Sequence, residues 1–203
     1  MIRFMFGEML PFRDPEPMRQ RIAAQWGGQE DLWVFGYASL IWRPEFEMAE
    51  RRQALVGGWH RALRMRSRIN RGTPEVPGLV FALLPGGSCR GVAYRVPRQR
   101  VEEELERLWA REMPTGVYDP RLVPTRTPEG PVRALTFTLS RRSPACLPPL
   151  DDAMLLDILR KARGRFGTTL EYLSETACAL QACGIQDREI TRLMNVARRA
   201  GLA

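Results

Sequence analysis

A buried strand that breaks into a polar turn is encoded at residues 32–42, LWVFGYASLIW. The run opens with four apolar residues, breaks at Gly36, offers a hydroxyl at Ser39 and then turns apolar again. A glycine break of this kind lets backbone N–H groups leave the sheet and point at a ligand. The turn at Phe35–Leu40 is therefore a candidate cradle for a charged small molecule. The alternative is a strand that simply ends in a β-bulge or turn.

The middle of the chain predicts further strands and one helix. Apolar patterns indicate strands at 54–69 with a turn at Gly57-Gly58, at 79–84 and 90–96, and at 117–127 and 132–139. The sequence PGGS between the strands at 79–84 and 90–96 is typical of a β-hairpin turn. Residues 98–111 carry apolar side chains at helical spacing, namely Val101, Leu105, Leu108 and Trp109.

The C-terminal third predicts helices with recognisable caps. Asp151 or Asp152 can cap a first helix, residues 168–171 (TTLE) have the spacing of a capping box for a second, and Asp187 can cap a third. The second helix is expected to stop at Gly184. Strands followed by helices place the chain in the α+β class.

Residues 1–30 are predicted to be an N-terminal extension to a domain over 31–203 that includes the C-terminal helices. The prolines Pro11, Pro15 and Pro17 exclude one continuous helix through the first half of the extension, and a short helix is expected over 18–26. The first residues lack the sustained apolar run and cleavage site of a secretory signal. A cytoplasmic location is therefore expected.

The composition is that of an ordinary globular protein with a basic surface. The chain has 203 residues, of which 44% are hydrophobic and 27% charged, and its net charge is +8. Almost all of the positive charge is arginine, since Lys161 is the only lysine. The charges are scattered and no nucleic-acid-binding motif accompanies them, so an anionic small molecule is favoured over nucleic acid. No membrane partner is expected, and the protein is expected to be a monomer or a weak homodimer.

The cysteines and the lone histidine favour no metal site. Cys89, Cys146, Cys178 and Cys183 form no CxxC pair and are predicted to be buried free thiols. His60 is expected to be a strand residue with its ring hydrogen-bonded. No dinucleotide, P-loop or zinc-protease signature is present either, so no cofactor is expected.

The Arg111-Glu112 pair is a second candidate for chemistry, where an amphipathic helix gives way to Pro114 and Gly116. A carboxylate at the C-terminus of a helix faces the negative end of the helix dipole, which raises its pKa. A raised pKa suits a general base that works near neutrality. The alternative is a surface glutamate paired with Arg111 or Arg107.

Three arginines alternate along one predicted strand, Arg64, Arg66 and Arg68, and would share one face of it. They could bind a substrate carboxylate. The alternative is a solvated face that discourages edge pairing. Tyr172 in the capped helix either belongs to the core or presents its hydroxyl to a pocket.

Five stretches, in order, closely resemble the motifs of the ChaC-like γ-glutamylcyclotransferases. They are 32–44 (LWVFGYASLIWRP), 71–79 (RGTPEVPGL), 89–94 (CRGVAY), 108–113 (LWAREM) and 170–173 (LEYL). The similarity covers about residues 31 to 184 and leaves 1–30 unexplained.

The resemblance implies a small, mixed β-barrel-like sheet with helices packed around it. It implies a lyase-type enzyme without metal or organic cofactor that acts on a γ-glutamyl peptide, with glutathione as the leading candidate and 5-oxoproline and Cys-Gly as products. Glu112 matches the acid/base glutamate of the family. The substrate-binding loop matches Phe35, Gly36, Tyr37, Ala38, Ser39 and Leu40. Tyr172 matches the late tyrosine motif, and Arg64 is a candidate partner for the glycine carboxylate.

This reaction fits a protein without a Ser or Cys nucleophile. The free α-amine of a γ-glutamyl group can reach its own side-chain carbonyl and close a five-membered ring. Glu112 would take the proton and return it to the leaving amine. The N–H groups of the turn would hold the α-carboxylate or the developing oxyanion.

Ala38 departs from the family motif, which usually has glycine at this position. If the residue needs a positive φ, alanine costs about 1 kcal/mol or more. If glycine only makes room, the methyl group crowds the substrate. Three other functions stay open: a cyclotransferase for other γ-glutamyl substrates, a non-catalytic binding module for acidic metabolites or partner proteins, and a nucleic-acid binder.

Overall fold

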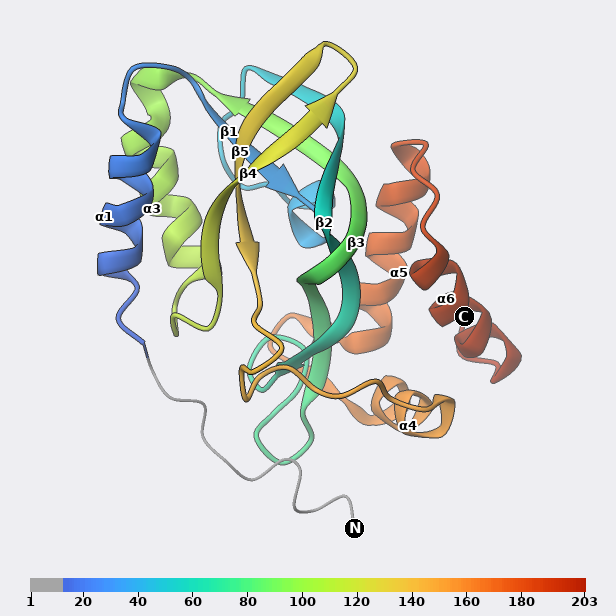
Figure 1. The fold of residues 1–203 in the computed structure, drawn as a ribbon. Coiled ribbons are helices and arrows are strands. Elements are labelled where there is room, and N and C mark those ends of the chain that lie inside the picture. Colours follow the sequence, from blue (N-terminus) through green and yellow to red (C-terminus); the bar gives the residue numbers. More distant parts are fainter. Residues whose placement is uncertain (1–12) are drawn as a thin grey trace. The chain divides into compact units, whose positions relative to one another are not determined.

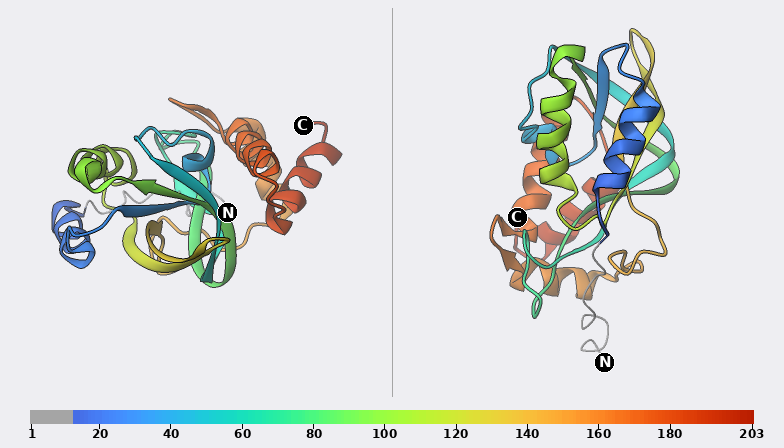
Figure 2. Two further views of the ribbon diagram at one scale, coloured as in Figure 1. Left: turned by 90° about the horizontal axis from the view of Figure 1, so that it is seen from above. Right: turned by 90° about the vertical axis from the view of Figure 1, so that its left-hand side faces the viewer.

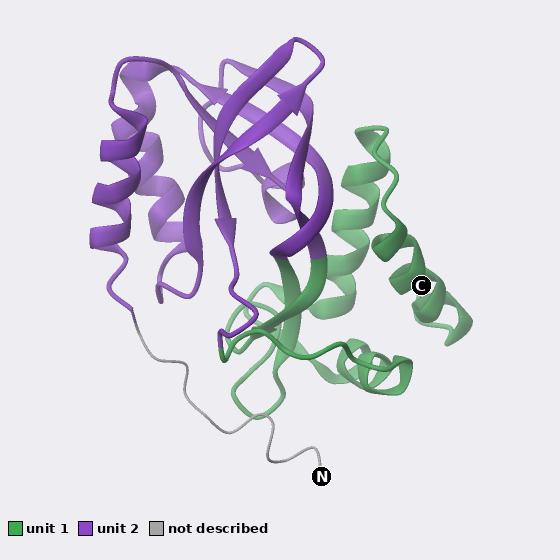
Figure 3. Cartoon of the chain, viewed as in Figure 1, with its two compact units in different colours: residues 1–10, 62–82, 144–203 green, residues 11–61, 83–143 purple. Residues whose placement is uncertain are grey.

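The computed structural model describes residues 13–203, which form two compact units. Unit 2 holds residues 13–61 and 83–143, and unit 1 holds residues 62–82 and 144–203 (Figure 3). Because residues 1–12 are outside the described part, the expectations for Pro11 and for a signal sequence concern residues that are not described.

Five strands form a closed barrel in the order β1-β3-β2-β4-β5, with β3 also pairing with β5 (Figure 1). Their bounds are β1 Leu32–Gly36, β2 Glu50–Ser67, β3 Gly78–Val96, β4 Asp119–Thr127 and β5 Gly130–Thr138. β1 runs antiparallel to β3 and parallel to β5, while β4 and β5 form an antiparallel hairpin. The α+β class and the mixed, barrel-like sheet are thereby confirmed.

The two long strands correct the prediction of turns within them. β2 and β3 run unbroken through Gly57-Gly58 and through Pro85–Ser88, so the expected turn and hairpin are wrong. Gly58, Gly86 and Gly87 do have positive φ angles, but these bend a continuing strand. The imidazole Nδ1 of His60 lies 2.8 Å from the Gly86 carbonyl oxygen, which confirms the prediction for this ring.

Unit 2 carries the helices α1 Glu16–Trp26, α2 Ser39–Trp42 and α3 Val101–Glu112, with the 3-10 turn η2 Arg98–Arg100 before α3. The predicted apolar stripe of α3 is buried: Val101, Leu105, Leu108 and Trp109. α1 and α3 run side by side on one flank of the unit, and α1 contacts β4 (Figure 2). The Trp109 ring packs edge-on against Phe137 of β5, with the ring centroids 5.5 Å apart. This contact anchors the C-terminal half of α3 to the sheet.

Unit 1 carries α4 Asp152–Lys161, α5 Thr169–Ala182 and α6 Arg188–Arg199, together with the short pair β6 Arg163–Gly164 and β7 Gly167–Thr168. Asp151 and Asp187 cap α4 and α6 through their side chains. The capping box at the start of α5 is present in both of its hydrogen bonds, between Thr168 and Glu171. The predicted helices and caps are confirmed, whereas the short β6–β7 pair was not anticipated.

The cysteines differ from the prediction in their burial. All four cysteines are free, but only Cys89 is buried and Cys178 is exposed, so the prediction of buried thiols is wrong for the other three. Among residues 13–203, no helix is long and apolar enough to cross a membrane.

Candidate active site

The loop from Phe35 to Leu40 leaves the sheet at a point where two glycines allow neighbouring parts of the chain to lie very close together. A Cβ on Gly36 would lie 3.0 Å from Leu40 Cβ and 3.1 Å from the Tyr94 ring. A Cβ on Gly91 of the neighbouring strand would lie 2.3 Å from the Gly36 carbonyl oxygen, which is a severe overlap. β1 ends at Gly36 and the short helix α2 begins at Ser39, so the predicted break in the strand is confirmed.

Three buried side chains hold this loop in place. The Tyr37 hydroxyl donates to the Phe137 carbonyl at 3.0 Å, and the Tyr94 hydroxyl donates to the Leu40 carbonyl at 2.9 Å. The third is Arg61, only 3% exposed, whose Nε donates to the Tyr37 carbonyl. Because hydrogen bonds to a charged donor are stronger than neutral ones, Arg61 is the strongest of these anchors. The loop is therefore held in one shape by the surrounding barrel residues.

Arg61 also joins the loop to β3, since its Nη2 donates to the Arg90 carbonyl at 2.6 Å. One guanidinium thus bridges the loop and the strand beside it. The sequence offered no signal for this role, because Arg61 is one of many arginines and its acceptors are remote in the chain. Tyr94 lies in the stretch 89–94 (CRGVAY), and nothing in that stretch predicts the contact of its hydroxyl with Leu40.

Ala38 has φ −146° and ψ −114°, so its backbone is not in the left-handed region. The penalty that a positive φ would bring does not apply, and of the two explanations offered for a glycine here only the need for space remains. Ala38 is 5% exposed, and its carbonyl accepts from the Ile41 N–H at 2.8 Å. The N–H groups of Ser39 and Leu40 come before this first hydrogen bond of α2 and have no acceptor within the helix itself.

Glu112 is the last residue of α3, and its side chain is 15% exposed. Burial raises the pKa of its carboxyl group above the ordinary value. The positive charge of Arg111 and its hydrogen bond lower this pKa in part, and the nearby Glu45 carboxylate raises it again. The sequence predicts a raised pKa for Glu112, and the direction agrees. The main cause is burial and not the helix dipole on which the prediction was based.

Arg111 links Glu112 to the chain that follows α2. Its Nε donates to Glu112 Oε1 at 2.9 Å, and its Nη1 lies 2.9 Å from Glu45 Oε2. The same Nη1 donates to the carbonyls of Arg43 and Pro44. The alternative of a surface pair is right in its partner, because Glu112 pairs with Arg111, but the pair is partly buried, with the two side chains 15% and 19% exposed.

Glu45 has an unusual backbone for its residue type. Its φ is +54°, and no other non-glycine residue within 13–203 has a positive φ. A left-handed conformation costs an L-residue about 1–2 kcal/mol. Contacts from Arg43 at 2.6 Å and from Arg111 hold its carboxylate. Strain of this kind persists where surrounding contacts fix it, commonly beside a functional site.

The two remaining predicted contacts, Arg64 and Tyr172, belong to unit 1. The Nε of Arg64 donates to the Leu147 carbonyl at 2.7 Å. The Tyr172 hydroxyl accepts the Phe81 N–H at 3.2 Å, and the Arg71 guanidinium lies over the Tyr172 ring at 5.2 Å from its centroid. Tyr172 is 5% exposed, so its side chain is buried within its own unit.

The other two arginines of the predicted row differ from each other. Arg66 is buried at 8% exposure, and Arg68 lies beyond the end of β2 and is half-buried. The picture of a fully solvated face is therefore wrong. Among the described residues, no group of three or more His, Cys, Asp and Glu side chains is placed to hold a metal ion.

Comparisons with known proteins agree with the motifs. Residues 32–200 match the family model described as ChaC-like protein. The glutathione-specific γ-glutamylcyclotransferase of Escherichia coli is 37% identical over 164 residues, covering 80% of this chain and 71% of that protein. The human glutathione-specific γ-glutamylcyclotransferase 1 is 34% identical, covering 80% of this chain and 76% of the relative.

A solved structure has the same fold. The crystal structure of a yeast γ-glutamyl cyclotransferase specific to glutathione superposes with a TM-score of 0.75 at 22% identity, covering 84% of this chain and 97% of that one. At this identity the likeness concerns the fold alone. Because the family model matches most of the sequence and curated relatives cover it at more than 30% identity, the chain belongs to the ChaC-like family.

Proposed function

We propose that this protein is a glutathione-specific γ-glutamylcyclotransferase that converts glutathione to 5-oxoproline and Cys-Gly. The observation that carries the proposal is Glu112, a largely buried carboxyl group with a raised pKa at the end of α3. It occurs in the same unit as the fixed loop Phe35–Leu40. The names of the curated relatives supply the substrate.

The reaction is an intramolecular transfer in which atoms balance without water. The α-amine nitrogen of the γ-glutamyl group attacks the side-chain carbonyl carbon and forms the new C–N bond of the ring. The bond from that carbon to the cysteine nitrogen breaks. Glu112 accepts the proton that the attacking amine loses and delivers it to the cysteine nitrogen, so the carboxyl group ends unchanged.

The raised pKa of Glu112 brings the carboxylate closer in proton affinity to the amine that it serves. A free α-amine has a reference pKa of about 7.7–8.0. A general base works best when its pKa lies near the working pH, and burial moves Glu112 in that direction. Arg111 lowers the same pKa and thereby favours the deprotonated carboxylate, which is the form that acts as a base.

The loop residues Phe35, Gly36, Tyr37, Ala38, Ser39 and Leu40 are proposed to bind the γ-glutamyl end. Support comes from the fixed loop shape and from the N–H groups of Ser39 and Leu40 at the start of α2, which can donate to an oxyanion or carboxylate. Tyr172 and Arg64 are proposed as further substrate contacts, on the family motif and on charge. We also propose a cytoplasmic monomer or weak homodimer whose partner is the small-molecule substrate, without nucleic acid or membrane.

Replacing Arg111 by Met is expected to move the acidic limb of the pH profile of kcat/KM to higher pH. Arg111 lowers the pKa of Glu112, so its loss raises that pKa further and the carboxyl stays protonated to higher pH. The protonated form cannot accept the amine proton. The measurement is kcat/KM for glutathione as a function of pH.

The matched control for this variant is Arg107→Met, one turn earlier on α3. Arg107 is an exposed arginine that pairs with Glu103 and Glu104 instead of Glu112. Its profile should coincide with that of the wild type. An acidic limb at the wild-type position in Arg111→Met would contradict the assignment of this limb to Glu112.

Ala38→Gly is expected to change KM for glutathione more than kcat. The φ of Ala38 is negative, so the substitution relieves no left-handed strain and mainly removes a methyl group from a buried loop. Steady-state kinetics of the two proteins decide this point. A change in kcat alone would contradict a role for the methyl group in substrate contact.

The second candidate is a cyclotransferase of the same mechanism that prefers other γ-glutamyl substrates. The basic net charge favours anionic peptides in general and does not select one. The test compares kcat/KM for glutathione with that for a γ-glutamyl dipeptide that lacks the glycine carboxylate. A clear preference for glutathione supports the proposal. A preference for the dipeptide would show that another γ-glutamyl compound, and not glutathione, is the preferred substrate. Binding of both without turnover would make the protein a binding module.

A further inference from the structure

The segment Arg13–Pro15, which we call the N-terminal strap, lies outside the part of the chain that matches the family model. It precedes α1 and is held by residues of α3 and of the chain after α3. The indole Nε1 of Trp109 on α3 donates to the Pro15 carbonyl at 3.0 Å. The Arg13 N–H donates to the Thr115 carbonyl at 3.2 Å.

The strap is hydrogen-bonded to the loop that directly follows Glu112, residues 113–118. The Arg13 guanidinium donates from Nε to the Gly116 carbonyl at 2.6 Å and from Nη2 to the Tyr118 carbonyl at 2.7 Å. Its Nη1 pairs with Asp119 at 2.9 Å. One side chain therefore occupies three acceptors spread over four consecutive residues.

The fit between strap and loop is close at Gly116. This residue has φ +63°, and a Cβ placed there would lie 2.0 Å from the Arg13 carbonyl oxygen. Its N–H donates to the Met113 carbonyl at 3.1 Å, and Met113 is fully buried immediately after Glu112. A shift of the loop at Gly116 would therefore be passed to the end of α3.

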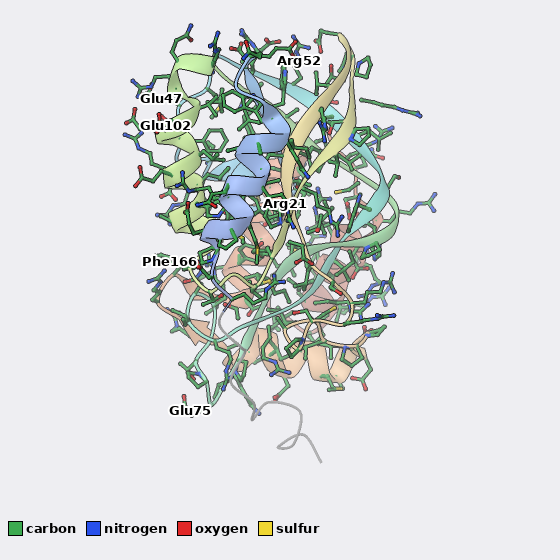
Figure 4. All side chains as sticks on the ribbon, turned by 60° about the vertical axis from the view of Figure 1, so that its left-hand side comes forward. Arg21, Glu47, Arg52, Glu75, Glu102 and Phe166 are labelled. Carbon is green, nitrogen blue, oxygen red and sulfur yellow. The ribbon has the colours of Figure 1, made fainter. Side chains whose placement is uncertain are left out.

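The remainder of the N-terminal segment supports the same side of unit 2. Arg21 lies on α1 (Figure 4), and its Nη2 donates to the Pro120 carbonyl at 3.3 Å. Arg19 makes a different contact, because its guanidinium pairs with Glu16 of its own helix. Arg13 therefore contacts the loop after Glu112. Arg19 pairs within its own helix, so a substitution of Arg19 is a suitable control for a substitution of Arg13.

We propose that Arg13 is a positioning residue for catalysis, which holds the loop 113–118 so that the Glu112 carboxyl stays at its working place at the end of α3. This inference rests on the proposed function of Glu112. The Arg13–Asp119 ion pair is half exposed and contributes little by itself. The carbonyl contacts and the close approach at Gly116 are what transmit the restraint.

The experiment compares Arg13→Gln with Arg19→Gln and with the wild type. Misplacing a catalytic group from a distance lowers the rate of the chemical step, so Arg13→Gln should lower kcat for glutathione about ten-fold while KM stays within about two-fold. Amide hydrogen exchange within 113–118 should rise in the same variant, because the loop loses its restraints. Arg19→Gln should match the wild type in both measurements.

The exchange measurement keeps this inference separate from the proposed function. If the wild type releases no 5-oxoproline, the proposed function fails, and raised exchange at 113–118 in Arg13→Gln still supports the hold of the strap on the loop. Unchanged exchange overturns the inference whatever the activity. In an active enzyme, kcat equal to that of Arg19→Gln overturns the positioning role, even if the melting temperature falls.

Discussion

Glu112→Gln is expected to lower kcat for 5-oxoproline release from glutathione by about 100- to 10,000-fold, the range that a general acid/base contributes. Glutamine has nearly the same shape as glutamate but cannot accept the proton of the attacking amine. Because burial already disfavours the charged carboxylate, a neutral amide is tolerated at this position. KM should change little, and the far-UV circular dichroism should match that of the wild type.

The matched control for this variant is Glu102→Gln on the same helix. Glu102 is exposed on the outer face of α3, ten residues before Glu112 (Figure 4). The chemical change is identical, and kcat should stay at the wild-type value. A folded Glu112→Gln enzyme with the kcat of its control would remove Glu112 from the mechanism.

Arg61→Met has the second largest expected effect, on both stability and activity. The substitution leaves the buried carbonyl of Tyr37 and the partly buried carbonyl of Arg90 without their guanidinium donor. An unsatisfied buried polar group costs about 1–3 kcal/mol, so the free energy of unfolding should fall by about 2 kcal/mol or more. The loop Phe35–Leu40 loses its strongest anchor, and kcat/KM for glutathione should fall about 10- to 100-fold.

Urea denaturation and steady-state kinetics check this prediction, with Arg51→Met as the control. Arg51 lies on the same strand, β2, and is exposed. The control should keep the free energy of unfolding within about 0.5 kcal/mol of the wild type, as surface substitutions do. Equal stability and equal kcat/KM in the two variants would show that Arg61 does not hold the loop.

Features that depend on near neighbours in the chain could be predicted from the sequence. The capping box of α5 and the caps of α4 and α6 involve residues three positions apart, so the pattern alone determines them. The buried stripe of α3 follows from helical spacing in the same way.

The long strands show where such reasoning fails. Two adjacent glycines permit either a tight turn or a bend within a strand, because both need positive φ angles. The choice depends on the neighbouring strand, which for Gly86 carries His60, 26 residues away in the sequence. Local sequence does not contain this information.

The sequence suggested the candidate site residues, but it did not indicate the side chains that hold them in place. The family motif indicated Glu112 and the loop, and the break at Gly36 indicated where the loop starts. The acceptors of Arg61 lie 24 and 29 residues away, so strand alternation favoured Arg64 and its neighbours instead. The burial that raises the pKa of Glu112 is likewise a property of the folded unit.

The measurement that tests the central claim most directly is a time course of the wild-type enzyme with glutathione, in which every product is quantified. The account predicts 5-oxoproline and Cys-Gly in equal amounts, because the α-amine of the substrate is the attacking group. Free glutamate in place of 5-oxoproline would show that water attacks instead, and unchanged glutathione would show that it is not the substrate; either result would contradict the account.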